Sequence, residues 1–114
     1  MLTVDALRDW GANVDEGLGR CFGKEDFYLN LVNMLLADGS FARLDAAVAA
    51  GDARAAFEAA HNLKGSTGNL ALTPVYVPVC AITEALRGQS DMKDVSAPHA
   101  EINAALASLR RLAQ

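Results

Sequence analysis

One histidine, His61, has neighbours that suit it for chemistry on phosphorus. A neutral imidazole, whose unperturbed pKa is about 6.5, keeps a lone pair that can attack a phosphorus atom. Lys64 lies three positions further on, close enough on a helix to attract an incoming phosphoryl group. Gly65 follows and offers no side chain, so that another protein can approach the ring closely. The sequence therefore predicts an exposed nucleophile, a nearby cation and space for a partner.

Three more residues share the side of the helix on which His61 lies. Phe57, Glu58 and Gly68 stand four, three and seven positions away, which are spacings that bring helical side chains together. We expect these three residues to contact a partner, with Phe57 either exposed as an apolar anchor or tucked between helices. Glycine inside a helix costs about 0.5–1 kcal/mol relative to alanine. Because Gly65 and Gly68 fall on the predicted exposed side, core packing is not expected to account for them.

The helix that carries His61 is predicted to begin after a cap at Asp52 and to reach about residue 68. One stripe of small and apolar residues spans about 60° of a helical wheel and forms the expected core face. The stripe consists of Ala56, Ala60, Leu63, Thr67 and Leu70. His61 lies roughly 150° from the centre of this stripe, so we expect its ring to face solvent.

The remaining segments are predicted to form amphipathic helices joined by short loops, with no competing strand pattern. The expected helices cover residues 3–10, a turn or two near 16–21, 25–37, 41–50, 73–86 and 98–112. Thr73 and Pro74 are expected to open one of them, and Pro98 the last. Pro78 predicts a bend or a delayed start of the regular helix. This pattern indicates an all-α antiparallel bundle, formed by residues 1–114 as a single domain.

Composition and charge exclude several classes of function. Ten basic and fourteen acidic residues give a net charge of −4, without a Lys/Arg run of the kind that binds nucleic acid. No apolar run approaches the roughly 20 residues of a membrane span, and residues 1–7 lack the features of a signal peptide, so we expect a cytoplasmic protein. Cys21, Cys80 and the two histidines show no metal-ligand spacing, and neither a metal nor a cofactor is expected. His99 is expected to be an ordinary surface residue.

Residues 60–70, AHNLKGSTGNL, resemble the signature of histidine-containing phosphotransfer (HPt) domains of two-component phosphorelays. In that signature the histidine is followed by x-Leu-Lys-Gly, then small residues and an Asn-Leu pair. A looser similarity is found at residues 17–20, 51–52 and 83–84. The sequence departs from the pattern at Ala71, where many relatives have glycine, and at residues 76–78, an unusual start for the next helix.

The resemblance implies a fold and a set of roles. It implies a four-helix bundle with one or two additional short helices. His61 would be the phosphoacceptor, Lys64 would stabilise the phosphoryl group, and Gly65 would give clearance to the partner. Such domains have no kinase activity of their own. They exchange the phosphoryl group with the aspartate of response-regulator receiver domains, which hold the Mg²⁺, and act with a sensor or hybrid histidine kinase. We expect a monomer.

The sequence leaves alternatives open. A non-catalytic adaptor, which binds receiver domains or kinases through a vestigial site, would have a similar sequence. Asn62 and Ser66 flank the site, and structural hydrogen bonding is as consistent with their positions as function is. Glu84 and Arg20 are expected to be a helix-face charge or hydrogen-bond partners within the bundle.

Overall fold

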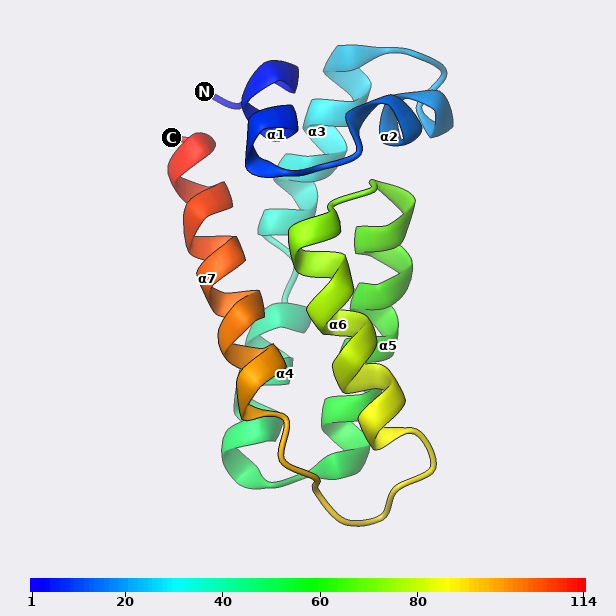
Figure 1. Ribbon diagram of the computed structural model, residues 1–114, viewed down its shortest axis with the longest axis vertical. Coiled ribbons are helices and arrows are strands. Elements are labelled where there is room, and N and C mark those ends of the chain that lie inside the picture. Colours follow the sequence, from blue (N-terminus) through cyan, green and yellow to red (C-terminus); the bar gives the residue numbers. More distant parts are fainter.

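A computed structural model describes all residues 1–114, and it contains helices and connecting loops without strands (Figure 1). The elements are α1 (Val4–Trp10), α2 (Val14–Arg20), α3 (Glu25–Leu36), α4 (Ser40–Ala50), α5 (Ala53–Asn69), α6 (Thr73–Leu86) and α7 (Ser96–Leu112). The helices α3 and α4 follow one another along one side of the bundle, and α5, α6 and α7 form the other three sides (Figure 1). The short helices α1 and α2 lie across one end. The predicted all-α four-helix bundle with one or two additional short helices is confirmed, and the additional helices are α1 and α2.

The ends of several helices follow from local sequence signals. The Asp52 carboxylate accepts a hydrogen bond from the Ala55 N–H at 3.1 Å and caps α5 as predicted. Gly51 ends α4 in the left-handed region, at φ 68°. Two helix starts differ from the prediction. Thr73 is the first residue within α6 rather than its cap. The helix α7 begins at Ser96 rather than at Pro98, because Pro98 still falls in the first turn, where its missing N–H is not needed.

Pro78 lies inside a continuous α6, and α2 covers residues 14–20 rather than the predicted 16–21.

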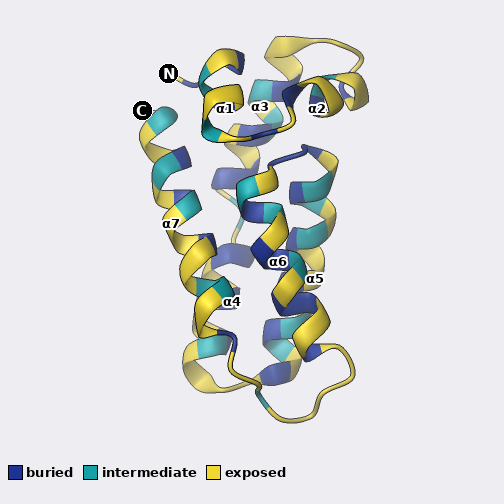
Figure 2. Cartoon of the chain, viewed as in Figure 1, coloured by how far each residue is buried: buried dark blue, intermediate teal, exposed yellow.

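Hydrophobic residues from every helix join one buried core (Figure 2). The predicted core face of α5 is confirmed, since its five residues are at most 5% exposed. This packing holds one face of α5 against the bundle and turns the opposite face to solvent.

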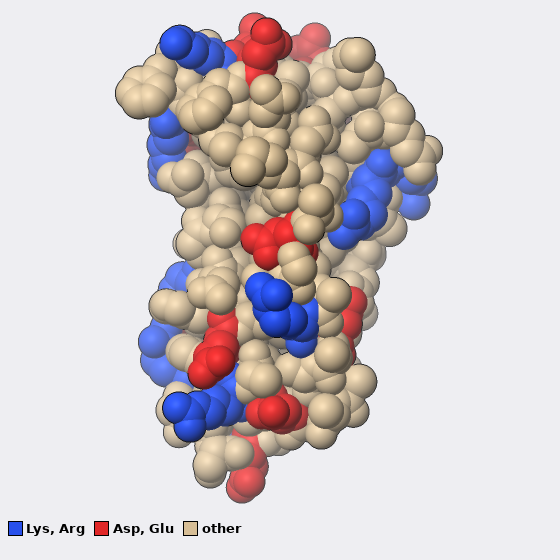
Figure 3. Space-filling view, turned by 180° about the vertical axis from the view of Figure 1, so that it is seen from behind, with Lys and Arg blue, Asp and Glu red and all other residues tan.

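His99 does not behave as an ordinary surface residue. Its Nε2 lies 2.6 Å from Oδ1 of Asp45, and this pair joins α7 to α4. The sequence did not indicate this partner, because Asp45 stands 54 positions away along the chain, where local spacing gives no signal. On the rear face, acidic and basic side chains are interspersed, so that no field of one sign covers that face (Figure 3). None of the helices combines the length and the apolar character that a membrane crossing requires.

Candidate functional site

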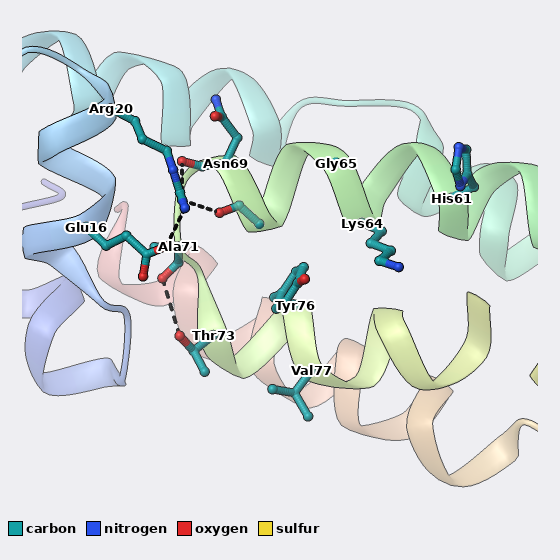
Figure 4. A pocket seen from close by; sticks show the side chains of 11 residues that line it. Glu16, Arg20, His61, Lys64, Gly65, Asn69, Ala71, Thr73, Tyr76 and Val77 are labelled. Carbon is teal, nitrogen blue, oxygen red and sulfur yellow. Dashed lines mark hydrogen bonds and ion pairs between the residues drawn. The ribbon is translucent and has the colours of Figure 1, made fainter. Parts of the chain in front are cut away.

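His61, in the middle of α5, lines the edge of an open groove that runs between α5 and α6. In Figure 4, Lys64 and Tyr76 point into the space between the two helices, and the His61 ring stands on the side of α5 away from α6. The imidazole is exposed, as its position opposite the core stripe predicts. The groove has a volume of about 770 Å³ and ends at α2. Its lining comprises His61, Lys64, Gly65, Gly68 and Asn69 of α5, Thr73, Tyr76 and Val77 of α6, Glu16 and Arg20 of α2, and Ala71 between α5 and α6. An exposed nucleophile at the edge of such a groove is accessible to a macromolecule.

The ring of Phe57 is stacked on that of His61. The two centroids are 5.8 Å apart and the ring planes differ by 12°. The guanidinium carbon of Arg87, beyond the end of α6, lies 5.5 Å from the centroid of Phe57, within the range of a cation–π contact. Phe57 is half-buried, and it contacts both an imidazole and a guanidinium rather than standing free as an anchor.

The Lys64 ammonium is paired with a carboxylate of the neighbouring helix α6. Its Nζ lies 3.6 Å from Oε1 of Glu84 on α6, and Arg87 donates to the same oxygen at 3.0 Å. Arg87 is the main cause of a lowered pKa of the Glu84 carboxyl, and Lys64 lowers it further. Glu84 is thus the counter-ion of the one cation beside His61, a role that its position in the sequence alone did not reveal.

The two glycines of the site have different reasons to be glycine. A Cβ on Gly65 would meet no atom within 4 Å, so nothing within this chain requires a glycine there. A Cβ on Gly68 would come within 2.7 Å of Cε1 of Tyr76. The expectation that packing does not account for Gly68 was therefore wrong, because the ring of the following helix covers it. Of the two glycines, Gly65 is thus the one that no contact within the chain explains.

Glu58 and Asn62 lie on the other side of α5, toward α4. Both line a separate hollow between α4 and α5, and Oε1 of Glu58 is 3.6 Å from Nε of Arg54. Ser66 donates to the Asn62 carbonyl at 3.2 Å within the helix, which is the structural alternative foreseen for this pair. The structure therefore brings Lys64, Gly65 and Gly68 together with His61 in one groove and leaves Glu58 outside it.

The carboxyl end of α5 is held by residues from the first part of the chain. Arg20 donates to the carbonyls of Gly68 at 2.7 Å and Asn69 at 3.2 Å. The buried Tyr28 hydroxyl donates to the Leu70 carbonyl at 2.8 Å, and burial raises the pKa of Tyr28 to about 12. These contacts bind carbonyls of the last turn of α5 and of Leu70 directly after it, and they fix the end of the groove. No three His, Cys, Asp or Glu side chains converge in a way that could hold a metal ion.

A comparison with protein families identifies the chain. Residues 35–112, more than half of the sequence, match the Hpt domain family, and the match contains His61 with all its neighbours on α5 and α6. The chain belongs to the Hpt family. Hpt domains carry out histidine phosphotransfer in two-component phosphorelays, in which they interact with kinases and receiver domains. The match begins near the end of α3, so α1, α2 and most of α3 lie outside it. Neither the curated proteins nor the solved structures gave a significant match.

Proposed function

We propose that this Hpt domain is a phosphorelay carrier, in which His61 accepts a phosphoryl group from the aspartate of a receiver domain and returns it to one. The observation that carries the proposal is the exposed imidazole in a groove, next to Lys64 and to a Gly65 that no internal contact explains. In the transfer, a nitrogen lone pair of His61 attacks the phosphorus of the aspartyl phosphate. A P–N bond forms, the P–O bond breaks, and the aspartate leaves as a carboxylate. The imidazole then loses the proton of its other nitrogen to solvent.

Lys64 stabilises the phosphoryl group in this proposal. Charge on the transferred oxygens attracts the Nζ ammonium, which in the unphosphorylated chain lies against Glu84. Glu84 keeps Arg87 as a partner when Lys64 turns toward the phosphoryl group, so the exchange leaves no unpaired carboxylate. Gly65 lets the wall of the receiver's active site approach α5. The domain supplies no metal; the Mg²⁺ belongs to the receiver. A sensor or hybrid kinase is the expected source of phosphate further upstream.

Labelling distinguishes a carrier from an adaptor with a vestigial site. Purified receiver domains are phosphorylated with acetyl phosphate and Mg²⁺, freed of donor and mixed with the chain. We expect the chain to acquire a phosphate that is labile in acid and stable in base, as a phosphohistidine is. His61→Gln should abolish the label. His99→Gln, which removes the other histidine, should keep it. Unchanged labelling of His61→Gln, or binding of receivers without any label, would contradict the proposal.

A further inference from the structure

The groove that contains His61 continues to α2, a helix outside the range matched by the family. His61 and Asn69, near the two ends of the groove wall formed by α5, are separated by about 12 Å at the usual helical rise of roughly 1.5 Å per residue. Glu16 and Arg20 of α2 close the far end (Figure 4). A protein that delivers an aspartyl phosphate to His61 and fills this groove therefore meets α2 as well.

The position of α2 relative to His61 is fixed by hydrogen bonds and by close packing. In addition to the two carbonyls bound by Arg20, the Asn13 N–H donates to the Ala71 carbonyl at 2.9 Å. Gly17 lies so close that a Cβ would be 2.6 Å from the Tyr28 ring and 2.7 Å from the Leu70 carbonyl oxygen. A group on α2 is thus held at a set distance and direction from the imidazole.

The far end of the groove presents the Glu16 carboxylate, which is paired with Arg20 but remains partly exposed. Two N–H groups of Arg20 are directed to α5 carbonyls and a third to Glu16, so its charge is largely committed within the chain. Glu16 accepts one bond from Arg20 and one from the Asn13 side chain at 3.0 Å, and its side chain stays 48% exposed. A carboxylate can accept about four hydrogen bonds, so it retains capacity for a donor from outside. The negative end of the α5 dipole lies beside it and adds to the attraction for a cation.

We infer that α2 determines which receiver domains bind, because the Glu16 carboxylate contacts a Lys or Arg side chain of the receiver at the end of the groove away from His61. The inference rests on the proposed function. The Tyr76 ring and Val77, which is 57% exposed, supply an apolar wall between the two contacts. The selected receiver therefore carries an apolar side chain that contacts α6 and a cationic side chain that contacts α2 when its aspartate faces His61. Charged contacts at the edge of an interface act on partner choice and on association more than on chemistry.

A matched pair of substitutions tests this contact. Glu16→Gln and Asp15→Asn each remove one negative charge from α2, but Asp15 lies outside the groove, 83% exposed and paired with Arg8 at 3.1 Å. The chain is first labelled with phosphoramidate, a small donor that needs no docking, and is then offered with Mg²⁺ to a panel of purified receiver domains. For the receiver that reacts fastest, we expect Glu16→Gln to lower kcat/KM about fivefold to tenfold, through KM. Asp15→Asn should change it less than twofold.

The receiver's side of the contact is found by a double-mutant cycle. Each Lys and Arg on the surface of that receiver is replaced by Gln, and one of these substitutions should have no further effect in the Glu16→Gln background. Amide NMR signals of residues 14–20 in the natural chain should also shift when the receiver is added, a measurement that does not depend on a variant's folding.

Equal effects of the two α2 substitutions, or no shift at residues 14–20, would overturn the inference. A chain that is labelled by phosphoramidate but transfers to no receiver would also overturn it, while leaving His61 as a phosphoacceptor. A chain that phosphoramidate fails to label would contradict the proposed function itself.

Discussion

The rings of Phe57 and His61 lie nearly parallel, with their centroids 5.8 Å apart. Stacking restricts the rotation of an exposed imidazole, which otherwise samples several rotamers, and so holds its nitrogen atoms in one direction. The guanidinium carbon of Arg87 lies 5.5 Å from the Phe57 centroid and connects this arrangement to the end of α6.

Phe57→Ala should slow the phosphorylation of His61 about threefold, because the imidazole must then be oriented during the reaction. The free energy of unfolding should fall by about 1 kcal/mol, since a half-buried ring is lost. The rate is measured with phosphoramidate, and stability by urea denaturation. Phe57→Leu preserves apolar volume without a flat ring and serves as the control for packing. An unchanged rate in both variants would show that the stacking has no part in reactivity.

Gly65→Gln should lower the rate of transfer from a phosphorylated receiver more than about tenfold, which corresponds to roughly 1.4 kcal/mol or more of steric cost in the complex. Labelling by phosphoramidate should change little, because a small donor needs no clearance. The isolated chain should be as stable or slightly more stable, since Gln is a better helix former and its side chain enters open space. Normal transfer from the receiver would refute the clearance role.

The ion pair between Arg87 and Glu84 predicts how the stability of the chain depends on pH. The fold lowers the pKa of the Glu84 carboxyl, mainly through Arg87, so the pair stabilises the chain above the ordinary carboxyl pKa. That stabilisation is lost as the pH falls through the lowered pKa. Arg87→Gln should therefore raise the pKa of Glu84 toward its ordinary value, as followed by carbon NMR of the carboxyl group. Arg54→Gln, which breaks the exposed pair of Arg54 with Glu58, should leave it unchanged. An unchanged Glu84 pKa in Arg87→Gln would contradict the contact between these two side chains.

Two glycines of α2 should respond in opposite ways to alanine. Gly17→Ala should reduce the free energy of unfolding by about 2 kcal/mol or more, because its Cβ would overlap the Tyr28 ring and the Leu70 carbonyl. Gly19→Ala, two positions later, meets nothing within 4 Å and should raise stability by about 0.5–1 kcal/mol. Chemical denaturation of both variants tests the pair. Similar effects would mean that α2 is not packed as described.

Much of the fold followed from local rules. The cap at Asp52, the glycine at position 51 and the stripe of small residues along α5 predicted both the helix and the face that it buries. The starts of α6 and α7 were displaced by one or two residues, because proline marks a first turn without specifying its position within that turn.

The contacts between distant segments were not predictable in the same way. Glu84 was expected to be a helix-face charge or a hydrogen-bond partner within the bundle, but the sequence did not name Lys64 as its partner, because their nearness depends on how far α6 is rotated against α5. Arg20 binds carbonyls 48 and 49 positions away, and Asp45 reaches His99 across 54 positions. Hydrogen bonding between such residues leaves no periodic pattern in a single sequence.

The order of residues alone determined that His61 stands on the exposed side of a helix with a lysine and a glycine one turn away, because helical geometry relates positions three and four apart wherever the helix lies. The tertiary structure decided what surrounds that turn. It placed the Glu84 carboxylate beside Lys64, the Tyr76 ring over Gly68, and α2 at the end of the groove. These depend on the packing of helices against a common core, which sets their rotation and offset, and no local rule specifies either quantity.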